Sequence, residues 1–298
     1  MSTISRFLDS FNSKETKRTY LYSIRCFFNF IHKNLKEIRS IDLLSYYDFL
    51  KSSGYKTSTQ QLKLNSIRSL FNWILYRTTA GEDLGFKKDD IPKLDFKLRW
   101  NDDDEPFVRE ILTFAEIELV LEKLKKLNFR YYIIFYMLAD TSMRANGLCN
   151  IKIDDIDFSN RAIKTKDKGK VRCYTFGSNL RLELINYVNM RKSINIDSEY
   201  LFINRKSKKE SVNNIFDIFN HNRGTRNARI CDILNGLEVE KYITPHCLRA
   251  SFKTNRRNAL QNDKDVEFFM QHGYDYKKTY LRYTDTQRLA LFDKYEFL

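Results

Sequence analysis

The first hundred residues place apolar side chains at the three- and four-residue spacing of α-helices. One stripe runs through residues 20–31 and a second through residues 67–74, and residues 41–50 between them predict a third helix. Aromatic stripes of this kind form protein cores far more often than base-stacking platforms. The pattern therefore predicts a helical domain over residues 1–95. The two stripes consist of Tyr20, Ile24, Phe27, Phe28 and Ile31, and of Ile67, Leu70, Phe71 and Ile74.

The helical period breaks between residues 93 and 109, where an acidic run at residues 101–106 ends in proline. This composition predicts a linker over residues 96–110 and a second domain over residues 111–298. Thr113 and Glu116 have the spacing of a capping box, so we expect a helix to begin after Thr113.

The second domain changes its pattern over residues 151–176, where short runs suited to strands are separated by turn residues. Residues 162–166 and 171–176 predict two antiparallel strands joined at a Gly169 turn. The rest of the chain returns to helical spacing, and an apolar stripe runs through its last residues: Leu289, Phe292, Tyr295 and Leu298. The fold class expected is mainly α, with a small antiparallel sheet in a mixed α+β second domain.

The charge balance points to a polyanionic partner. The 298-residue chain has a formal net charge of +14, and lysine and arginine gain affinity for nucleic acid by releasing counterions from phosphates. An anionic membrane is a weaker alternative, because no apolar stretch approaches the roughly 20 residues that span a bilayer. The five cysteines are scattered without a CxxC pair, which disfavours a zinc site and a disulfide framework and favours a reducing, cytoplasmic compartment.

Three short strings in the second domain bring together residues suited to phosphodiester chemistry. Arg144 lies in TSMRANGL, His246 and Arg249 lie in TPHCLRASF, and His272 and Tyr283 lie in QHGYDYKKTYLRYT. Arginines clamp a phosphodiester with planar pairs of donors, and histidines donate to its oxygens or move protons. A tyrosine hydroxyl can attack phosphorus and hold it as an ester.

These strings resemble those of the tyrosine recombinase (phage integrase) family, whose members carry T-G-x-R-x-x-E-L, T-P-H-x-L-R-H, G-H and T-x-x-Y-like motifs. The match at residues 244–249 is the most specific. The chain departs from the family at Gly147, where a glutamate is usual, and at Ala250, where a histidine is usual. A supporting carboxylate is therefore missing or comes from elsewhere. The spacing after His272 is longer than usual, which leaves Tyr280 as an alternative to Tyr283.

The resemblance implies a role for each residue. Arg144 and Arg249 would hold the non-bridging oxygens, with His246 and His272 donating to the same phosphate, and Tyr283 would attack phosphorus. A hairpin lysine supplies the leaving oxygen's proton in the family. Lys166 is the preferred candidate here and Lys168 the alternative, among the hairpin lysines Lys164, Lys166, Lys168 and Lys170. Because the phosphotyrosine keeps the ester bond energy, no cofactor, ATP or metal is expected.

The resemblance thus implies a site-specific DNA recombinase in which a SAM-like N-terminal domain and the catalytic domain clamp duplex DNA. It also implies a homotetramer on paired sites and a tail that docks either on its own domain or on a neighbouring protomer. Neither a membrane nor a small-molecule substrate is expected. Two alternatives remain, a type IB topoisomerase-like enzyme and a non-catalytic DNA-binding relative.

Overall fold

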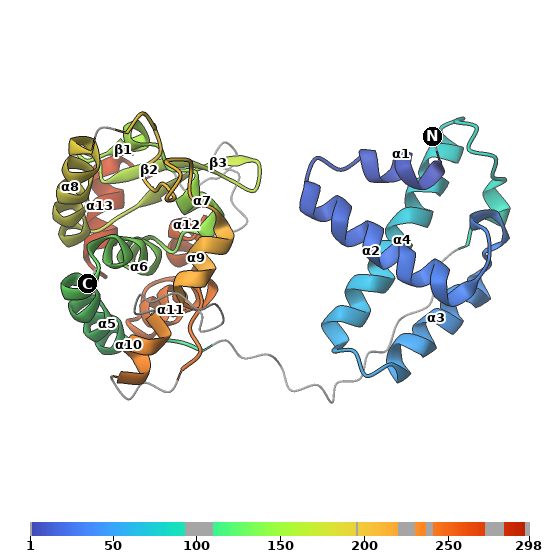
Figure 1. Ribbon diagram of the computed structural model, residues 1–298, viewed down its shortest axis with the longest axis horizontal. Helices are drawn as coiled ribbons and strands as arrows, with labels where there is room; N and C mark the ends of the chain where they lie inside the picture. Colours follow the sequence, from blue (N-terminus) through green and yellow to red (C-terminus); the bar gives the residue numbers. More distant parts are fainter. Residues whose placement is uncertain are drawn as a thin grey trace. The chain divides into compact units, whose positions relative to one another are not determined.

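The computed structural model describes residues 2–92, 110–194, 196–219, 230–236, 241–271 and 283–295. The chain divides into two compact units, residues 1–107 and 108–298 (Figure 1). The predicted linker, residues 96–110, lies outside the described residues except for its last position. Within the described ranges, no helix has the length and apolarity that a bilayer crossing requires.

The regular elements in the described part of the first unit are all helical. Ser13 caps the second helix, its Oγ accepting a hydrogen bond from the Thr16 amide at 3.2 Å, as its position before the apolar stripe suggests. The elements are α1 (Thr3–Asp9), α2 (Lys14–Ile31), the 3₁₀ turn η1 (Leu35–Glu37), α3 (Ser40–Ser52), α4 (Thr57–Thr79) and η2 (Lys88–Asp90). Both predicted stripes pack into one core. Ile24 and Phe27 are buried, as are all four residues of the second stripe.

The second unit combines helices with one small sheet. Thr113 caps its first helix through the predicted capping box, since its amide donates to Glu116 Oε2 at 2.7 Å. The helices are α5 (Phe114–Leu127), α6 (Phe129–Thr141), α7 (Ala145–Cys149), η3 (Ile153–Asp155), α8 (Ser178–Ser193), α9 (Val212–Phe219), α10 (Ile230–Gly236), α11 (Pro245–Asn258), α12 (Asp263–Phe269) and α13 (Asp285–Asp293).

The sheet has the order β1-β2-β3, and both pairings are antiparallel. Its strands are β1 (Ile156–Asp157), β2 (Ala162–Asp167) and β3 (Lys170–Thr175). Lys168 and Gly169 form the turn between β2 and β3 and both have positive φ, +49° and +78°. A two-residue hairpin turn with this geometry matches the twist of its strands, and glycine adopts it without strain. The mainly α fold with a small antiparallel sheet is therefore confirmed.

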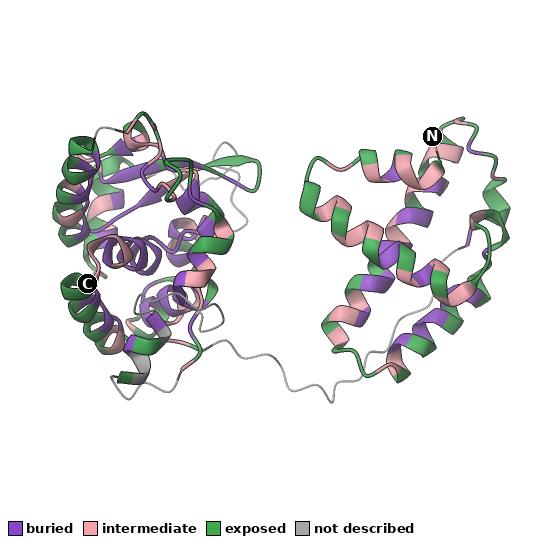
Figure 2. Cartoon of the chain, in the orientation of Figure 1, coloured by how far each residue is buried: buried purple, intermediate pink, exposed green. Residues whose placement is uncertain are grey.

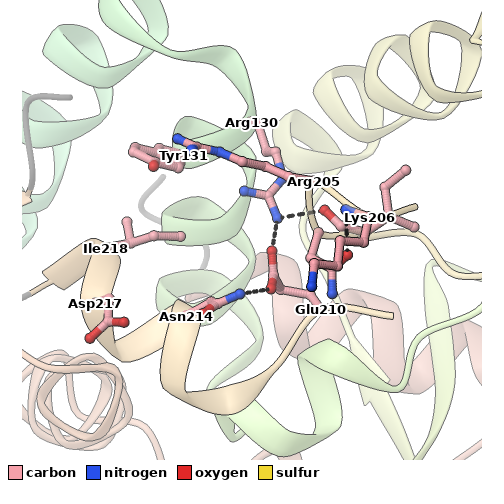
Figure 3. A pocket seen from close by; sticks show the side chains of 10 residues that line it. Arg130, Tyr131, Arg205, Lys206, Glu210, Asn214, Asp217 and Ile218 are labelled. Carbon is pink, nitrogen blue, oxygen red and sulfur yellow. Dashed lines mark hydrogen bonds and ion pairs between the residues drawn. The ribbon is translucent and has the colours of Figure 1, made fainter. Parts of the chain in front are cut away.

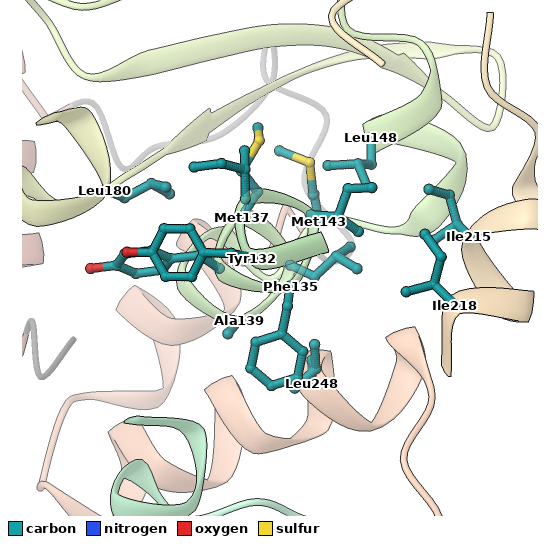
Figure 4. Close-up of a cluster of buried hydrophobic side chains, with 14 of the residues drawn as sticks. Tyr132, Phe135, Met137, Ala139, Met143, Leu148, Leu180, Ile215, Ile218 and Leu248 are labelled. Atoms are coloured by element: carbon teal, nitrogen blue, oxygen red, sulfur yellow. The ribbon is translucent and has the colours of Figure 1, made fainter. Parts of the chain in front are cut away.

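The core of the second unit forms around α6. All ten residues from Tyr132 to Thr141 are buried, so the helix appears almost wholly purple in Figure 2. Apolar side chains from α7, α8, α9 and α11 surround it, among them Leu148, Leu180, Ile215 and Leu248 (Figure 4). In Figure 1 the sheet and α8 lie on one side of α6, and α5 and α11 lie on the other. The residues that follow α6 are consequently anchored to a helix that is packed on all sides.

The tail helix α13 packs on its own unit in this structure. Phe292 is fully buried with Phe252, Val266 and Phe269. The Arg256 guanidinium lies 4.2 Å from the centre of the Phe292 ring. Of the other predicted stripe residues, Leu289 and Tyr295 are half-buried, and Leu298 lies outside the described residues.

Candidate active site

Arg144 lies directly beyond the C-terminus of α6. The helix ends at Ser142, which has a left-handed φ of +55° and is fully buried. This is the position where the family motif has glycine, the residue that adopts positive φ without strain. The left-handed turn redirects the chain, so that Arg144 becomes the N-cap residue of α7. The side chain of Arg144 is 15% exposed and so remains accessible to a ligand.

Arg249 reaches the same region from α11. Thr244 caps this helix and Pro245 occupies its first turn, as the sequence predicts. The buried Arg249 guanidinium donates to Ser142 O at 2.5 Å and to Met270 O at 2.7 Å. These carbonyls end α6 and α12, and a cation is favoured at helix C-termini. Two of the five N–H donors of Arg249 are used in this way among the described residues.

A buried carboxylate that belongs to none of the sequence motifs lies beside the arginines. Asp167, the last residue of β2, has a side chain with no solvent exposure. Its Oδ2 accepts a hydrogen bond from Arg144 Nη1 at 2.7 Å and one from the Tyr174 hydroxyl at 3.3 Å. The same oxygen lies 3.6 Å from Arg172 Nε. Arg172 also donates to the Gln271 carbonyl.

These groups form one electrostatic cluster, which we call the arginine cluster: Arg144, Arg172, Arg249, Tyr174 and Asp167. Burial and, next, the charge of Arg144 together lower the pKa of Arg249 to about 10, while Tyr174 and Asp167 oppose the change. Burial also raises the pKa of Tyr174 to about 12, with Asp167 adding to the rise. Tyr174 therefore stays protonated at neutral pH and can donate to the carboxylate. The structure thus brings Arg144 and Arg249 together.

Of the two predicted histidines, the structure describes only His246. His246 is exposed in the first turn of α11, three residues before Arg249, and its ring centre lies 5.9 Å from that of Phe216 on α9. Residues three apart share a helix face, so His246 lies on the side of α11 from which Arg249 extends. His272 lies outside the described residues, one position beyond Gln271.

Tyr283 is held by a carboxylate on α12. Its hydroxyl donates to Asp265 Oδ1 at 2.6 Å, and its ring packs edge-on against Phe268 with centres 5.3 Å apart. The hydroxyl oxygen that would attack phosphorus is therefore engaged in a hydrogen bond to an acid in this structure. The alternative nucleophile, Tyr280, lies outside the described residues.

The candidate lysines lie at the end of the β2–β3 hairpin. Side chains alternate between the faces of a strand, and Asp167 faces the arginines, so its neighbour Lys166 points to the opposite face. Lys166 is exposed there. Lys168 is exposed in the turn. Neither lysine contacts the arginine cluster through an interaction seen among the described residues.

A separate hollow of about 570 Å³ opens at the other end of α6 (Figure 3). Arg130 lines it, forming an ion pair with the buried Glu210 and donating to Ile203 O at 3.1 Å. Asn214 donates to the same carboxylate at 2.7 Å. Since the 13-residue α6 is about 20 Å long, this hollow is distinct from the arginine cluster at its far end.

Sequence reasoning identified the arginines but not Asp167, Arg172, Tyr174 or Asp265. One signal was present for Asp167. On a strand whose inward positions include Ile163 and Thr165, the next inward position carries an acid. A buried charge is uncommon without a partner, so this position marks a buried ion pair. Nothing in the sequence indicates Asp265 as the partner of Tyr283.

Two protein-family descriptions match this chain. Residues 110–288 match the phage integrase family, and residues 5–80 match the N-terminal SAM-like domain of phage integrases. The chain therefore belongs to the phage integrase family and is a tyrosine recombinase, a site-specific enzyme that cleaves and rejoins DNA. This confirms the family, the fold class and the general function that the motifs imply.

Several curated relatives are similar over most of their length. The chain is 24% identical to tyrosine recombinase XerC of Staphylococcus carnosus, over 89% of this chain and 85% of that protein. It is 26% identical to a tyrosine recombinase of Pseudothermotoga lettingae, over 95% and 92%. Among solved structures, the Tn1549 transposon integrase in complex with transposon right end DNA has a TM-score of 0.64 at 21% identity, covering 97% of this chain and 98% of that one. The XerH recombinase bound to its difH substrate has a TM-score of 0.63 at 18% identity, covering 87% and 74%.

Proposed function

We propose that this recombinase cuts one DNA strand at a time through a 3′-phosphotyrosine intermediate made by Tyr283. The observation that supports this most directly is the pairing of Arg144 and Arg249 at the end of a rigid, buried helix. Two guanidinium groups can hold the two non-bridging oxygens of a phosphodiester. In the pentacoordinate transition state those oxygens gain charge, and donors already in place stabilise it without reorganisation.

The remaining steps are assigned to the other motif residues, in the roles that the family resemblance implies. Tyr283 attacks phosphorus and forms a phosphotyrosine ester, and the 5′-oxygen of the next nucleotide leaves. His246 and His272 donate to the phosphate. Lys166, or Lys168 as the alternative, gives a proton to the leaving oxygen. Attack by the free 5′-hydroxyl of another strand reverses these steps, so the bond energy is conserved and no cofactor or metal takes part.

The proposed substrate is duplex DNA, and the assembly is a homotetramer on two paired sites. The positive net charge and the similarity to recombinases solved with DNA support the substrate. We further propose that residues 1–95 clamp the duplex together with residues 111–298, joined by a linker at 96–110. The scattered cysteines and the DNA substrate support action in the cytoplasm.

Mapping of covalent protein–DNA adducts on a library of duplex half-sites tests this function. We expect a denaturation-resistant adduct on a subset of sequences, lost in Tyr283→Phe with DNA binding retained, because only the attacking oxygen is removed. If Tyr280→Phe abolishes the adduct instead, the nucleophile is misassigned by three residues. Wild-type protein that binds DNA without forming an adduct would indicate a non-catalytic relative. Efficient relaxation of supercoiled DNA that lacks selected sites would indicate a topoisomerase.

A half-site with sulfur in place of the leaving 5′-oxygen tests the lysine. A thiolate leaves without needing a proton, because a thiol is far more acidic than an alcohol; the cysteine thiol, for example, has a pKa near 8.5. We therefore expect Lys166→Ala to cleave the oxygen substrate slowly and the sulfur substrate at the wild-type rate, with Lys168→Ala as the matched control. If the sulfur substrate restores the cleavage rate of Lys168→Ala instead, Lys168 in the turn is the residue that gives the proton to the leaving oxygen.

A further inference from the structure

The family motif has a glutamate three residues after its first arginine, and this chain has Gly147 there. The structure shows what lies beside that position. A Cβ atom placed on Gly147 would be 3.6 Å from Asp167 Cβ and 3.6 Å from Thr165 Cγ2. The Thr165 hydroxyl donates to Gly147 O at 2.8 Å, so β2 and α7 are in direct contact. A side chain at 147 would therefore begin in van der Waals contact with the Asp167 side chain.

We propose that Asp167 is the positioning residue for Arg144, supplying from strand β2 the carboxylate that position 147 lacks. The inference rests on the proposed function of Arg144 as a phosphate clamp. Asp167 does not touch the DNA in this proposal. It acts by fixing the Arg144 guanidinium through the 2.7 Å hydrogen bond to Nη1, which leaves the other donors of Arg144 for the phosphate.

Burial makes this contact strong and specific. The Asp167 side chain has no solvent exposure, and an ionised carboxylate is costly to bury unless cations and hydrogen-bond donors surround it. Arg144 and Tyr174 donate hydrogen bonds to one oxygen, Oδ2, and the charged Arg172 guanidinium lies 3.6 Å from it. The second oxygen, Oδ1, is buried without a hydrogen-bond partner among the described residues. The carboxylate is therefore held through Oδ2, and Arg144 is oriented against a buried partner.

The net charge of the arginine cluster also suits stabilisation of the pentacoordinate transition state. Three guanidinium groups, those of Arg144, Arg172 and Arg249, carry three positive charges, and Asp167 carries one negative charge, which leaves a surplus of two. A phosphodiester carries one negative charge, and its pentacoordinate transition state carries about two. The surplus therefore matches the transition state better than the ground state, as catalysis requires. A second carboxylate beside Asp167 would reduce the surplus to one.

Exchange of the carboxylate between the two positions tests the proposal. The readout is the single-turnover rate of adduct formation on a half-site that the wild-type protein cleaves, with DNA affinity and thermal unfolding measured in parallel. We expect Asp167→Asn to slow the adduct roughly 100-fold, the effect of a small misplacement of a catalytic group, with DNA affinity nearly unchanged. Gly147→Glu alone should also be slow, since it forces two carboxylates together. The double variant Gly147→Glu/Asp167→Gly should recover most of the rate.

The matched control is Asp140→Asn. Asp140 is similarly buried in the same unit, but its Oδ2 accepts from the Gly177 amide at 2.7 Å rather than from the cluster arginines. It should lose stability without a selective loss of adduct rate. If Asp167→Asn cleaves at the wild-type rate, or if the double variant is folded and no faster than its single variants, the positioning role is wrong. Absence of adduct from the wild-type protein would instead refute the proposed function.

Discussion

Removal of the charge from Asp265 should speed up DNA cleavage. Tyr283 donates to Asp265 Oδ1 at 2.6 Å, and we expect this bond to restrain the hydroxyl, so that it breaks before the oxygen reaches phosphorus. The contact is part-buried, so solvent screens it only in part. Asp265→Asn keeps the shape of the side chain and an acceptor oxygen but removes the negative charge.

The size of the effect follows from the kind of bond. Hydrogen bonds to charged groups contribute about 1.5–3 kcal/mol and neutral ones about 0.5–1.5 kcal/mol. Partial exposure favours the lower end of each range, so the substitution weakens the restraint by about 1 kcal/mol. If release of Tyr283 limits the rate, the adduct should form about fivefold faster, since 1.36 kcal/mol corresponds to a factor of ten.

The assay is the single-turnover rate of adduct formation on a cleavable half-site, resolved on a denaturing gel. Asp263→Asn is the matched control, because Asp263 also lies in the first turn of α12 but pairs with Arg257 at 2.5 Å. Both variants lose similar helix-terminal charge, and only Asp265→Asn should be faster. A slower Asp265→Asn variant would refute the reasoning and make Asp265 a base that helps Tyr283 lose its proton. An unchanged rate would mean that release is not limiting.

Three further outcomes are expected. Arg144→Lys and Arg249→Lys should each lower the adduct rate by several orders of magnitude, because an ammonium group cannot reproduce the planar donor pair, and near-normal rates would argue against bidentate contact. Ser142→Gly should raise the unfolding free energy by about 1 kcal/mol, because it relieves a left-handed φ and removes a buried hydroxyl with no partner among the described residues. Thermal melts should show a midpoint higher by roughly 2–4 °C. Limited proteolysis of the free protein should cut first within residues 93–109 and leave two stable fragments, and DNA should protect the segment; resistance without DNA would contradict a linker there.

Much of the fold follows from the sequence because its signals are local. A helical stripe, a capping box at Thr113 and a glycine turn at Gly169 each act within a few residues, so pattern and structure agree at these places. The arginines were also predictable, since their motifs fix both the residue and its local backbone. Thr244 and Pro245 begin α11, and that start sets the face from which Arg249 extends.

The partners of these residues were not predictable, because they come from distant segments. Asp167 is 23 positions from Arg144, and it meets that arginine only because the hairpin folds against α7. The strand alternation that places Asp167 inward also places Lys166 outward. This direction conflicts with the proposed role of Lys166 as proton donor to the leaving oxygen, and the motif alone does not reveal the conflict. Asp265 meets Tyr283 across 18 positions, and no local pattern links the two.

The restraint on the proposed nucleophile, Tyr283, and the geometry of the proposed arginine clamp depend on one helix, α12. Asp265 lies in the first turn of α12 and holds Tyr283, while the carbonyl of Met270, which ends the same helix, accepts from Arg249 Nη2 at 2.7 Å. Loss of the charge at Asp265 changes only the first contact. A displacement of α12, by contrast, changes both, because a seven-residue helix moves as a unit. Release of Tyr283 through movement of α12 would therefore alter how Arg249 is held at the same moment, whereas release by rotation of the tyrosine alone would leave the clamp in place.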